Sequence, residues 1–448
     1  MLKRFTVENF SSYQDENCLD LTAGRTEFHQ NHIVDFPKVK ILKSALVYGA
    51  NASGKSNLIK AIDYAKSIII KSLKSKDIDT HQKYFRLDNL SSKKATSFEF
   101  EFELNDKFFS YGFSLMLEEV KITEEWLFEI GKTTPEKIFE RKNNEIVLGK
   151  ILKNKSIKEL KNIIETYAYG MKNQSHKLFL SEISNKQLDI KDVEILNDIF
   201  KWFDEKLILV YPNSQFAGIS LIGNNTNLDT VFKKYLYEFD TGIIDISSIE
   251  EDFDKVLKND LKIKKDITND FLKKETKNII LLDKNKEIAL TIYKNKDNEL
   301  KVRKLGLIHN IEVDDIFELK DESDGTKRLF DLIPLLEHFS QDFTIIIDEF
   351  DRSLHPKLAR KFLELFYNIE NSKSQLIVTT HESSLLDLDL LRRDEIWFAE
   401  KNKHGASKLF TLNQFKVRYD SKIEKAYLLG RYGAIPIFKT FHEIELDN

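Results

Sequence analysis

Residues 49–56 read 49-GANASGKS-56, a complete G-x-x-x-x-G-K-[ST] motif. The apolar run 44-SALVYG-49 precedes it, and from Ser56 the apolar residues follow helical spacing. A strand, this loop and a helix form the context in which the motif cradles phosphates. Gly49 and Gly54 let the backbone turn its N–H groups inward, and the helix N-terminus adds its dipole. The stretch therefore predicts a nucleoside triphosphate site in an α/β fold, in preference to a glycine turn without a ligand.

The side chains of this loop have predicted roles. Lys55 is expected to reach the β- and γ-phosphates as a point charge, and the Ser56 hydroxyl is expected to ligate Mg²⁺. Asn51, Ser53 and Asn57 complete the predicted contacts around the nucleotide.

A pair of carboxylates follows a second apolar strand in 343-FTIIIDEFD-351. One carboxylate is needed in the Mg²⁺ shell, and a neighbouring one can polarise water for in-line attack on the γ-phosphate. Asp348 suits the first role and Glu349 the second. An acidic pair after a strand is unremarkable alone, but together with the phosphate loop it predicts hydrolysis of ATP.

Two further segments are candidates for the same site. In 374-SQLIVTTHES-383 an apolar strand ends at His381, whose neutral imidazole could hydrogen-bond a γ-phosphate oxygen, although a histidine there is often structural. In 322-ESDGTKR-328, Ser323 and Gly325 open a helix whose N–H groups could bind an anion. An ordinary helix N-cap is the plain alternative for that segment.

Composition excludes several classes of protein. In the 448 residues, 69 Lys+Arg face 73 Asp+Glu, so a polybasic nucleic-acid coat is absent while a local basic groove remains compatible. The single cysteine, Cys18, excludes an intrachain disulfide and a cysteine zinc cluster. The N-terminus lacks a signal-peptide pattern, and no apolar run approaches the roughly 18–20 residues of a membrane helix. We expect a soluble, cytoplasmic protein without a membrane partner.

The chain divides into three expected parts. Residues 1–118 form the first half of an α/β head with antiparallel strands, and 301–448 form its second half. Between them, residues 119–300 are rich in Lys, Glu, Asn, Ile and Leu, which predicts a mainly helical inserted lobe for dimerisation or sensing. Expected helices include 151–168, 188–206, 325–339 and 356–370, and expected strands include 97–104, 108–117, 279–282, 288–293, 300–305 and 375–379.

The order of phosphate loop, large insertion, signature-like segment, acidic pair and histidine resembles the ABC-type ATPases of the SMC, RecF and OLD class. The resemblance implies a P-loop NTPase head with a mixed sheet and an antiparallel β subdomain. It implies that ESDGT is a diverged signature, that Asp351 is the D-loop aspartate and that His381 is the switch histidine. Two copies would then sandwich two ATP molecules, each site completed in trans by Ser323 and Gly325. The metal-sensing glutamine expected after the first helix has Gln82 as its candidate.

A narrower likeness is carried by 322-ESDGTKRLFDLIPLL-336, 348-DEFDRSLHP-356, 391-LRRDEIWFAEK-401 and 427-YLLGRYGAIPIF-438. These segments are similar to bacterial RloA-like AAA ATPases, which often accompany a second gene in restriction or abortive-infection systems. The likeness covers approximately 1–115 and 300–438. It implies anti-phage defence and a separately encoded effector such as a nuclease, a TOPRIM-like protein or a toxin.

An internal nuclease is not expected. Asp387 and Asp389 form an Asp-x-Asp pair, but the surrounding leucines place these carboxylates toward solvent, and Glu400 has no partner carboxylates in the sequence. The tail 427–438 suits either an apolar turn that packs on the head or, through its aromatic and arginine residues, a partner-binding surface. The packing role is the preferred interpretation.

Two functions fit these observations, and a third conflicts with one of them. The first is an ATP-gated sensor that controls a separate effector and acts as a homodimer or higher oligomer. The alternative is a DNA-maintenance ATPase of the RecF/SMC type that clamps duplex DNA, which predicts ATP-enhanced, salt-sensitive binding. The third, a scaffold that uses ATP only as structural glue, conflicts with the presence of Glu349.

Overall fold

A computed structural model describes residues 1–436 except 132–133, 144, 151, 153–165, 167, 172–173, 185–193, 217–221, 223–225, 259, 274–277, 283–288, 313–314 and 417–421. The chain forms two compact units. Unit 1 comprises Met1–Tyr211, Phe339–Phe350 and Tyr367–Asn448, and unit 2 comprises Pro212–His338 and Asp351–Phe366. The expected helix at 151–168 and the first residues of the one at 188–206 lie largely outside the described residues.

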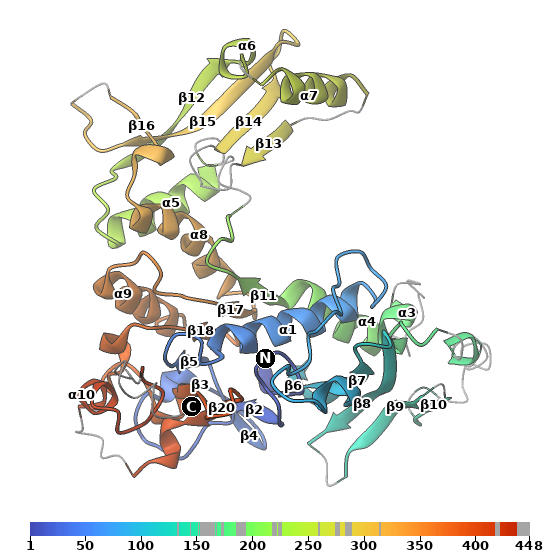
Figure 1. Ribbon diagram of the computed structural model, residues 1–448. Coiled ribbons are helices and arrows are strands. Elements are labelled where there is room, and N and C mark those ends of the chain that lie inside the picture. Colours follow the sequence, from blue (N-terminus) through green and yellow to red (C-terminus); the bar gives the residue numbers. More distant parts are fainter. Residues whose placement is uncertain are drawn as a thin grey trace, which may run out of the picture. The chain divides into compact units, whose positions relative to one another are not determined.

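The centre of unit 1 is a six-stranded, mainly parallel sheet (Figure 1). Its order is β11 (Leu207–Val210), β17 (Thr344–Ile347), β18 (Gln375–Thr379), β5 (Ser44–Tyr48), β19 (Ile396–Lys401) and β20 (Ser407–Thr411). Only β20 runs antiparallel to its neighbour. The continuous apolar sequences of β5, β17 and β18 suit strands that are buried on both faces. The predicted α/β P-loop fold is confirmed by this sheet and by α1 (Lys55–Ile70), which follows β5.

A second, antiparallel sheet of seven strands completes unit 1. Its order is β10 (Glu145–Leu148), β9 (Glu136–Lys142), β8 (Lys121–Ile130), β7 (Lys107–Met116), β6 (Thr96–Leu104), β1 (Leu2–Glu8) and β2 (Asn17–Asp20). The boundary expected between residues 118 and 119 falls inside this sheet, because β8 pairs with β7 along almost its whole length. The three-part division is thus corrected here: residues up to Tyr211 belong with the head.

The alternation of β6 explains how this sheet packs. Phe98, Phe100 and Phe102 are fully buried on one face, as the period of two predicts. Phe100 contacts Phe5 with ring centroids 4.8 Å apart, and Phe102 stacks on Trp202 at 4.5 Å. Aromatic side chains bury large apolar areas and therefore contribute strongly to this core.

Shorter elements surround the two sheets of unit 1. The hairpin of β3 (Ile33–Phe36) and β4 (Val39–Leu42) precedes β5. The helices α3 (Phe179–Ser184) and α4 (Glu194–Lys201) are followed by a π-helical turn at Trp202–Lys206 that leads directly into β11. Near the C-terminal end lies α10 (Ile423–Leu428).

Unit 2 contains an antiparallel sheet and several helices. The strands run in the order β12 (Asp245–Asp252), β15 (Leu300–Ile308), β14 (Ala289–Lys294) and β13 (Asn278–Leu282), with β16 (Phe317–Glu318) also paired to β15. The helices are α5 (Thr226–Glu238), α6 (Phe253–Val256), α7 (Leu261–Lys273), α8 (Asp324–His338) and α9 (Pro356–Tyr367). A small core of its own, including Phe253, Phe271 and Ile292, lies between the sheet and α6 and α7.

The mainly helical lobe expected at 119–300 is corrected to a mixture of helices and strands in the described residues, and two of the strands, β13 and β14, lie where strands were expected at 279–282 and 288–293. The described residues contain strands from both units as well as helices, from β8 through β14. Two of their carboxylates, Glu250 and Glu251 of β12, form cross-strand ion pairs with Arg303 (2.7 Å) and Lys304 (2.8 Å) of β15. None of the helices in the described ranges is long and apolar enough to cross a membrane.

Candidate functional site

The phosphate loop joins β5 to α1 in unit 1, as the motif predicts. Gly54 caps the helix with a φ of 114°, a backbone conformation in which a side chain is strained. A Cβ at Gly54 would also collide with the side chain of Ser407, and one at Gly49 would collide with the carbonyl of Ala399. Glycine is therefore required at both positions, because the backbone of the loop passes too close to β19 and β20 to leave room for a side chain.

Lys55 lies at the first turn of α1 and is buried. Its ammonium donates to the carbonyl oxygens of Gly49 (2.7 Å) and Ala50 (3.1 Å). The lysine thus spans the mouth of the loop and is held where a phosphate anion would lie against the helix N-terminus.

The Ser56 hydroxyl donates to Asp348 Oδ1 over 3.1 Å, across 292 residues of sequence. These are the two residues predicted to ligate Mg²⁺, and they come together at the carboxyl ends of β5 and β17. Asp348 is buried, and its backbone N–H donates to the carbonyl oxygen of Val210 (2.9 Å) at the end of β11. The carboxylate is therefore held by its neighbours on both sides.

Glu349 follows with a φ of 49°, in the left-handed region that non-glycine residues seldom occupy. Its backbone N–H donates to Thr379 Oγ1 (2.8 Å), and the Thr379 hydroxyl in turn donates to Asp348 Oδ1 (2.6 Å). Strained backbone is typical of functional sites that their surroundings hold in place. Thr379 is fully buried and fixes both carboxylate residues.

Sequence reasoning missed Thr379 and three residues that support the loop from behind. The Tyr13 hydroxyl donates to the carbonyl of Gly54 (3.1 Å), and Asn57 Nδ2 donates to Ser12 Oγ (2.8 Å). The Ser407 hydroxyl lies within 2.7 Å of both Ser12 Oγ and the carbonyl oxygen of Ser53. Burial raises the pKa of Tyr13, so that it stays a neutral donor. Isolated hydroxyls of this kind carry no sequence signal.

The residues fit a Mg²⁺ nucleotide. The Ser53 hydroxyl is buried and has no hydrogen-bond partner among the described residues, so it is available to a phosphate oxygen. In the described ranges, no three His, Cys, Asp or Glu side chains form a metal cluster. Mg²⁺ is usually held by one or two carboxylates together with substrate phosphates and waters, and the contact of Ser56 with Asp348 suits such a site. Ser56 and Asp348 would supply the protein ligands.

His381 and Gln82 occupy the margin of this region. His381 is exposed, two residues after β18, whose last residue, Thr379, contacts Asp348. Gln82 is half-buried with a φ of 53°, and the next residue, Lys83, accepts a hydrogen bond from Ser11 N–H (2.6 Å). The turn that bears Gln82 is thereby tied to the segment of Ser12 and Tyr13 behind the loop.

The signature-like segment lies in unit 2. Ser323 caps α8, since its hydroxyl accepts from Thr326 N–H over 3.1 Å. Gly325 passes so close to the turn at 351–354 that a Cβ there would lie 2.9 Å from the carbonyl oxygen of Ser353, and Asp351 begins this turn. Ser323 is exposed, so both the N-cap and an additional anion-binding role are compatible with its position.

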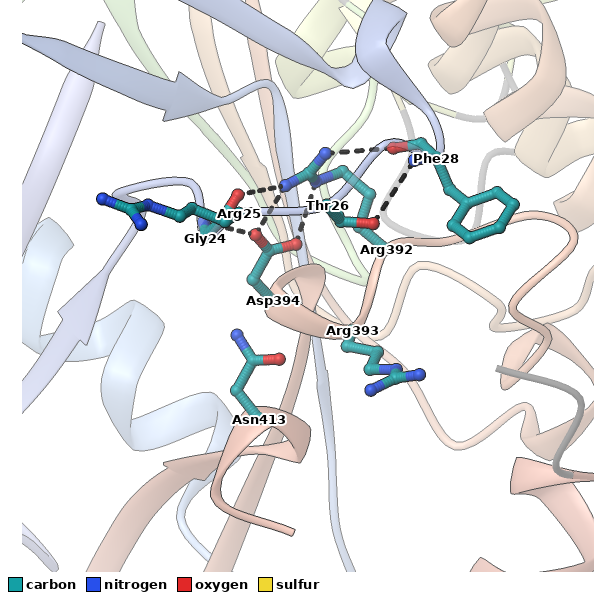
Figure 2. A pocket seen from close by; sticks show the side chains of 8 residues that line it. All are labelled: Gly24, Arg25, Thr26, Phe28, Arg392, Arg393, Asp394 and Asn413. Carbon is teal, nitrogen blue, oxygen red and sulfur yellow. Dashed lines mark hydrogen bonds and ion pairs between the residues drawn. The ribbon is translucent and has the colours of Figure 1, made fainter. Parts of the chain in front are cut away.

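The segment 391–401 has a structural role in unit 1. Figure 2 shows the buried Arg392 guanidinium, which pairs with Asp394 (2.8 and 2.9 Å) and donates to the carbonyls of Gly24 and Phe28. These bonds anchor the 24–28 loop. Arg25 and Arg393 also line the pocket in Figure 2, and there they point away from each other.

The tail packs on the head, in agreement with the preferred interpretation. Tyr427 and Tyr432 stack on Phe398 with ring centroids 5.6 and 5.8 Å apart. Glu400 accepts from the backbone N–H of Ala434 (3.1 Å), so its carboxylate holds the tail. The Asp-x-Asp pair lies in irregular structure between two short 3₁₀ helices, not in a helix, and Asp389 is exposed.

Comparisons with known proteins extend this description. A family model described as "AAA domain, putative AbiEii toxin, Type IV TA system" matches residues 44–387. An SMC head domain from Thermotoga maritima shares 13% identity with a TM-score of 0.37, over 92% of this chain and 98% of that one. An SMC head bound to the C-winged helix domain of ScpA shares 12% identity with a TM-score of 0.40, over 92% and 97%. Comparison with curated proteins gives no match.

Proposed function

Because this chain belongs to the AAA domain family whose model spans residues 44–387, we propose that it is an ATPase that switches a separately encoded effector. The observation that carries the proposal is the contact of Ser56 with Asp348, which joins the phosphate loop to the acidic pair over 3.1 Å. Ligand contacts at the carboxyl ends of adjacent parallel strands are typical of open α/β sheets.

The proposed mechanism assigns a task to each residue. Lys55 binds the β- and γ-phosphates, while Gly49, Ser53 and Gly54 shape the loop that surrounds them, with Asn51 and Asn57 at its edge. Ser56 and Asp348 would hold Mg²⁺, which neutralises phosphate charge when it is bound.

Glu349 orients and deprotonates the attacking water, and Thr379 positions its backbone. His381 donates to or accepts from the γ-phosphate region and reports its presence. Gln82 is proposed as the metal-sensing glutamine.

The site is proposed to be completed by a second copy of the chain. Ser323 and Gly325 of one copy would contact the γ-phosphate bound by another, and Asp351 would lie at the interface between copies. ATP would then close a homodimer or a higher homo-oligomer. The support is the exposed position of Ser323 at the N-terminus of α8, a site that favours anions.

The effector is proposed to be a nuclease, a TOPRIM-like protein or a toxin in bacterial defence. The support is the family description, which refers to a type IV toxin–antitoxin system, and the RloA-like segments. Closure of the head pair would alter the surface that the effector contacts.

The decisive experiment compares the purified wild-type protein with the Glu349→Gln variant. We expect the wild type to hydrolyse ATP in the presence of Mg²⁺, and the variant to retain ATP and double its solution mass when ATP·Mg²⁺ is added. Equal hydrolysis by the two proteins would exclude the proposed role of Glu349. Metal-dependent cleavage of DNA by the wild type alone would exclude a separate effector, and strong salt-sensitive clamping of duplex DNA would favour a DNA-maintenance ATPase.

A further inference from the structure

A basic groove lies in unit 1 beside α10. It has a volume of about 580 Å³ and is lined by Phe415, Lys416, Lys422, Lys425, Ala426, Leu429, Arg431 and Tyr432. All four cationic side chains are exposed, and no carboxylate of the described residues lines the groove. Among the described side chains, none forms an ion pair with these four cations. In a chain of net charge −4, this is a local concentration of positive charge with which no carboxylate of the described residues is paired.

Backbone hydrogen bonds hold the end of α10, next to which these exposed cations lie. Gly430 ends α10 with a φ of 76°, and its N–H donates to the carbonyl of Tyr427 (2.8 Å), while Arg431 N–H donates to Ala426 (3.0 Å). Such bonds are typical of a helix C-terminus closed by glycine. The one carboxylate of the helix, Glu424, accepts from Ser383 Oγ (3.0 Å) and does not line the groove.

The same surface also exposes apolar side chains. Leu428 and Leu429 are 59% and 64% exposed, and Leu429 lines the groove. Of the two aromatic residues that line the groove, Phe415 is half-buried and Tyr432 is packed inside the fold. Tyr432 is 7% exposed, stacks on Phe398 and contacts Phe415 edge-on at 5.1 Å.

The exposed cations, the exposed leucine and the covered ring of Tyr432 together distinguish between two kinds of anionic partner. Single-stranded nucleic acids bind through ring faces on which bases stack, together with cations that follow the backbone. The ring of Tyr432 is already covered, and an exposed leucine offers nothing to a phosphate backbone. A protein segment with carboxylates and apolar side chains matches both the cations and Leu429.

We propose that the basic groove binds an acidic, leucine-containing segment of a separate protein. The proposal deepens the proposed function, on which it rests, because it names the surface through which a partner is held and the chemistry of that partner. Carboxylates of the segment pair with Lys422, Lys425 and Arg431, and its apolar side chains cover Leu429.

The test uses a fluorescein-labelled peptide of alternating Glu and Leu, a Glu and Ser peptide of equal length and charge, and a 30-nucleotide single-stranded DNA. Binding is measured by fluorescence anisotropy with the full chain. The groove variant carries K422E, K425E and R431E, and the matched control carries K401E, K403E and K408E on the exposed β19–β20 hairpin. Both triple variants change the net charge equally.

We expect the Glu and Leu peptide to bind the wild type and the control alike, and to bind the groove variant at least about tenfold more weakly, as the loss of three exposed ion pairs requires. The Leu429→Ser variant should bind the Glu and Leu peptide about fivefold more weakly than the wild type does. The wild type should bind the Glu and Ser peptide about fivefold more weakly than the Glu and Leu peptide, since a buried leucine contributes on the order of 1 kcal/mol. The proposal would be overturned if the wild type did not bind the Glu and Leu peptide, or if the groove variant and the control bound it equally. It would also be overturned if binding did not depend on leucine. Displacement of the peptide by the DNA would overturn it in favour of nucleic acid.

A measurement of ATP hydrolysis distinguishes a failure of the groove proposal from a failure of the proposed ATPase function. The groove variant should hydrolyse ATP at the wild-type rate, because none of its three substituted residues contacts the phosphate loop or the acidic pair. A wild type that binds the peptide but does not hydrolyse ATP would refute the proposed ATPase while the groove assignment stands.

Discussion

Replacing Thr379 by valine should loosen both carboxylate residues while nearly preserving the shape of the side chain. The lost hydroxyl donates to Asp348 Oδ1 (2.6 Å) and accepts from Glu349 N–H (2.8 Å) in a fully buried position. A hydrogen bond to a charged group contributes about 1.5–3 kcal/mol and one between neutral groups about 1 kcal/mol. We therefore expect the free energy of unfolding of unit 1 to fall by about 3 kcal/mol.

Tryptophan fluorescence during urea unfolding measures this change in unit 1 alone. The three tryptophans of the chain are Trp126, Trp202 and Trp397, and all of them belong to unit 1. With a slope on the order of 3 kcal/mol per molar urea, the midpoint should fall by about 1 M. Thr379→Ser is the matched control, because it keeps the hydroxyl and loses one methyl group at a cost of about 1 kcal/mol.

The valine variant should also bind ATP·Mg²⁺ more weakly than the serine variant, since Asp348 loses a bond that orients it. Equal unfolding midpoints and equal nucleotide affinities for the two variants would refute the reasoning that Thr379 holds the acidic pair.

Three further predictions concern single side chains. Lys55→Ala should weaken ATP binding roughly a hundredfold, since a charged contact to the phosphates is lost, whereas Lys60→Ala on the exposed face of the same helix should leave it unchanged in a titration with a fluorescent ATP analogue. Glu349→Gln should lower ATP turnover at least about a hundredfold without weakening binding; unchanged phosphate release would indicate that ATP serves only as structural glue. Burial raises the pKa of the Cys18 thiol to about 11, so iodoacetamide should label it slowly at pH 8 and faster as the pH approaches 11. Because the folded state favours the neutral thiol, Cys18 stabilises the folded protein fully below the unfolded pKa of about 8.5, and this contribution to the free energy of unfolding is lost as the pH rises toward 11. The Cys18→Ala variant should not show this pH dependence.

The elements with local patterns could be predicted from the sequence. The phosphate loop, the acidic pair and the alternation of Phe98, Phe100 and Phe102 each lie within a few consecutive residues, and the structure has the loop and strands where they were expected. Thr379 could not be assigned its role, because its two hydrogen bonds depend on how β17 and β18 pair, a property of the tertiary fold. Ser12 and Ser407 are likewise brought together from segments almost 400 residues apart.

The region 119–300 was predicted only in part: the strands expected at 279–282 and 288–293 are β13 and β14, but the strands β8 to β12 were not expected. Lys and Glu have a high helix propensity, so a sequence rich in them predicts helices. This prediction assumes that each charged side chain is exposed to solvent. In β12 the carboxylates of Glu250 and Glu251 form ion pairs instead with Arg303 and Lys304 of the neighbouring strand β15. The sequence of β12 has no apolar–polar alternation, so no local pattern reveals that it pairs with β15 about 50 residues away.

The order of strands in the central sheet has a consequence for synthesis on the ribosome. The strand β5, which carries the phosphate loop, pairs only with β18 and β19, whose first residues are Gln375 and Ile396. Roughly 330 residues must therefore be translated before β5 acquires a neighbour, which at 5–20 residues per second takes about 15–65 s. During this interval a strand that is fully buried in the folded protein lacks both of its neighbours, so its apolar side chains stay exposed unless a chaperone or the early antiparallel sheet covers them.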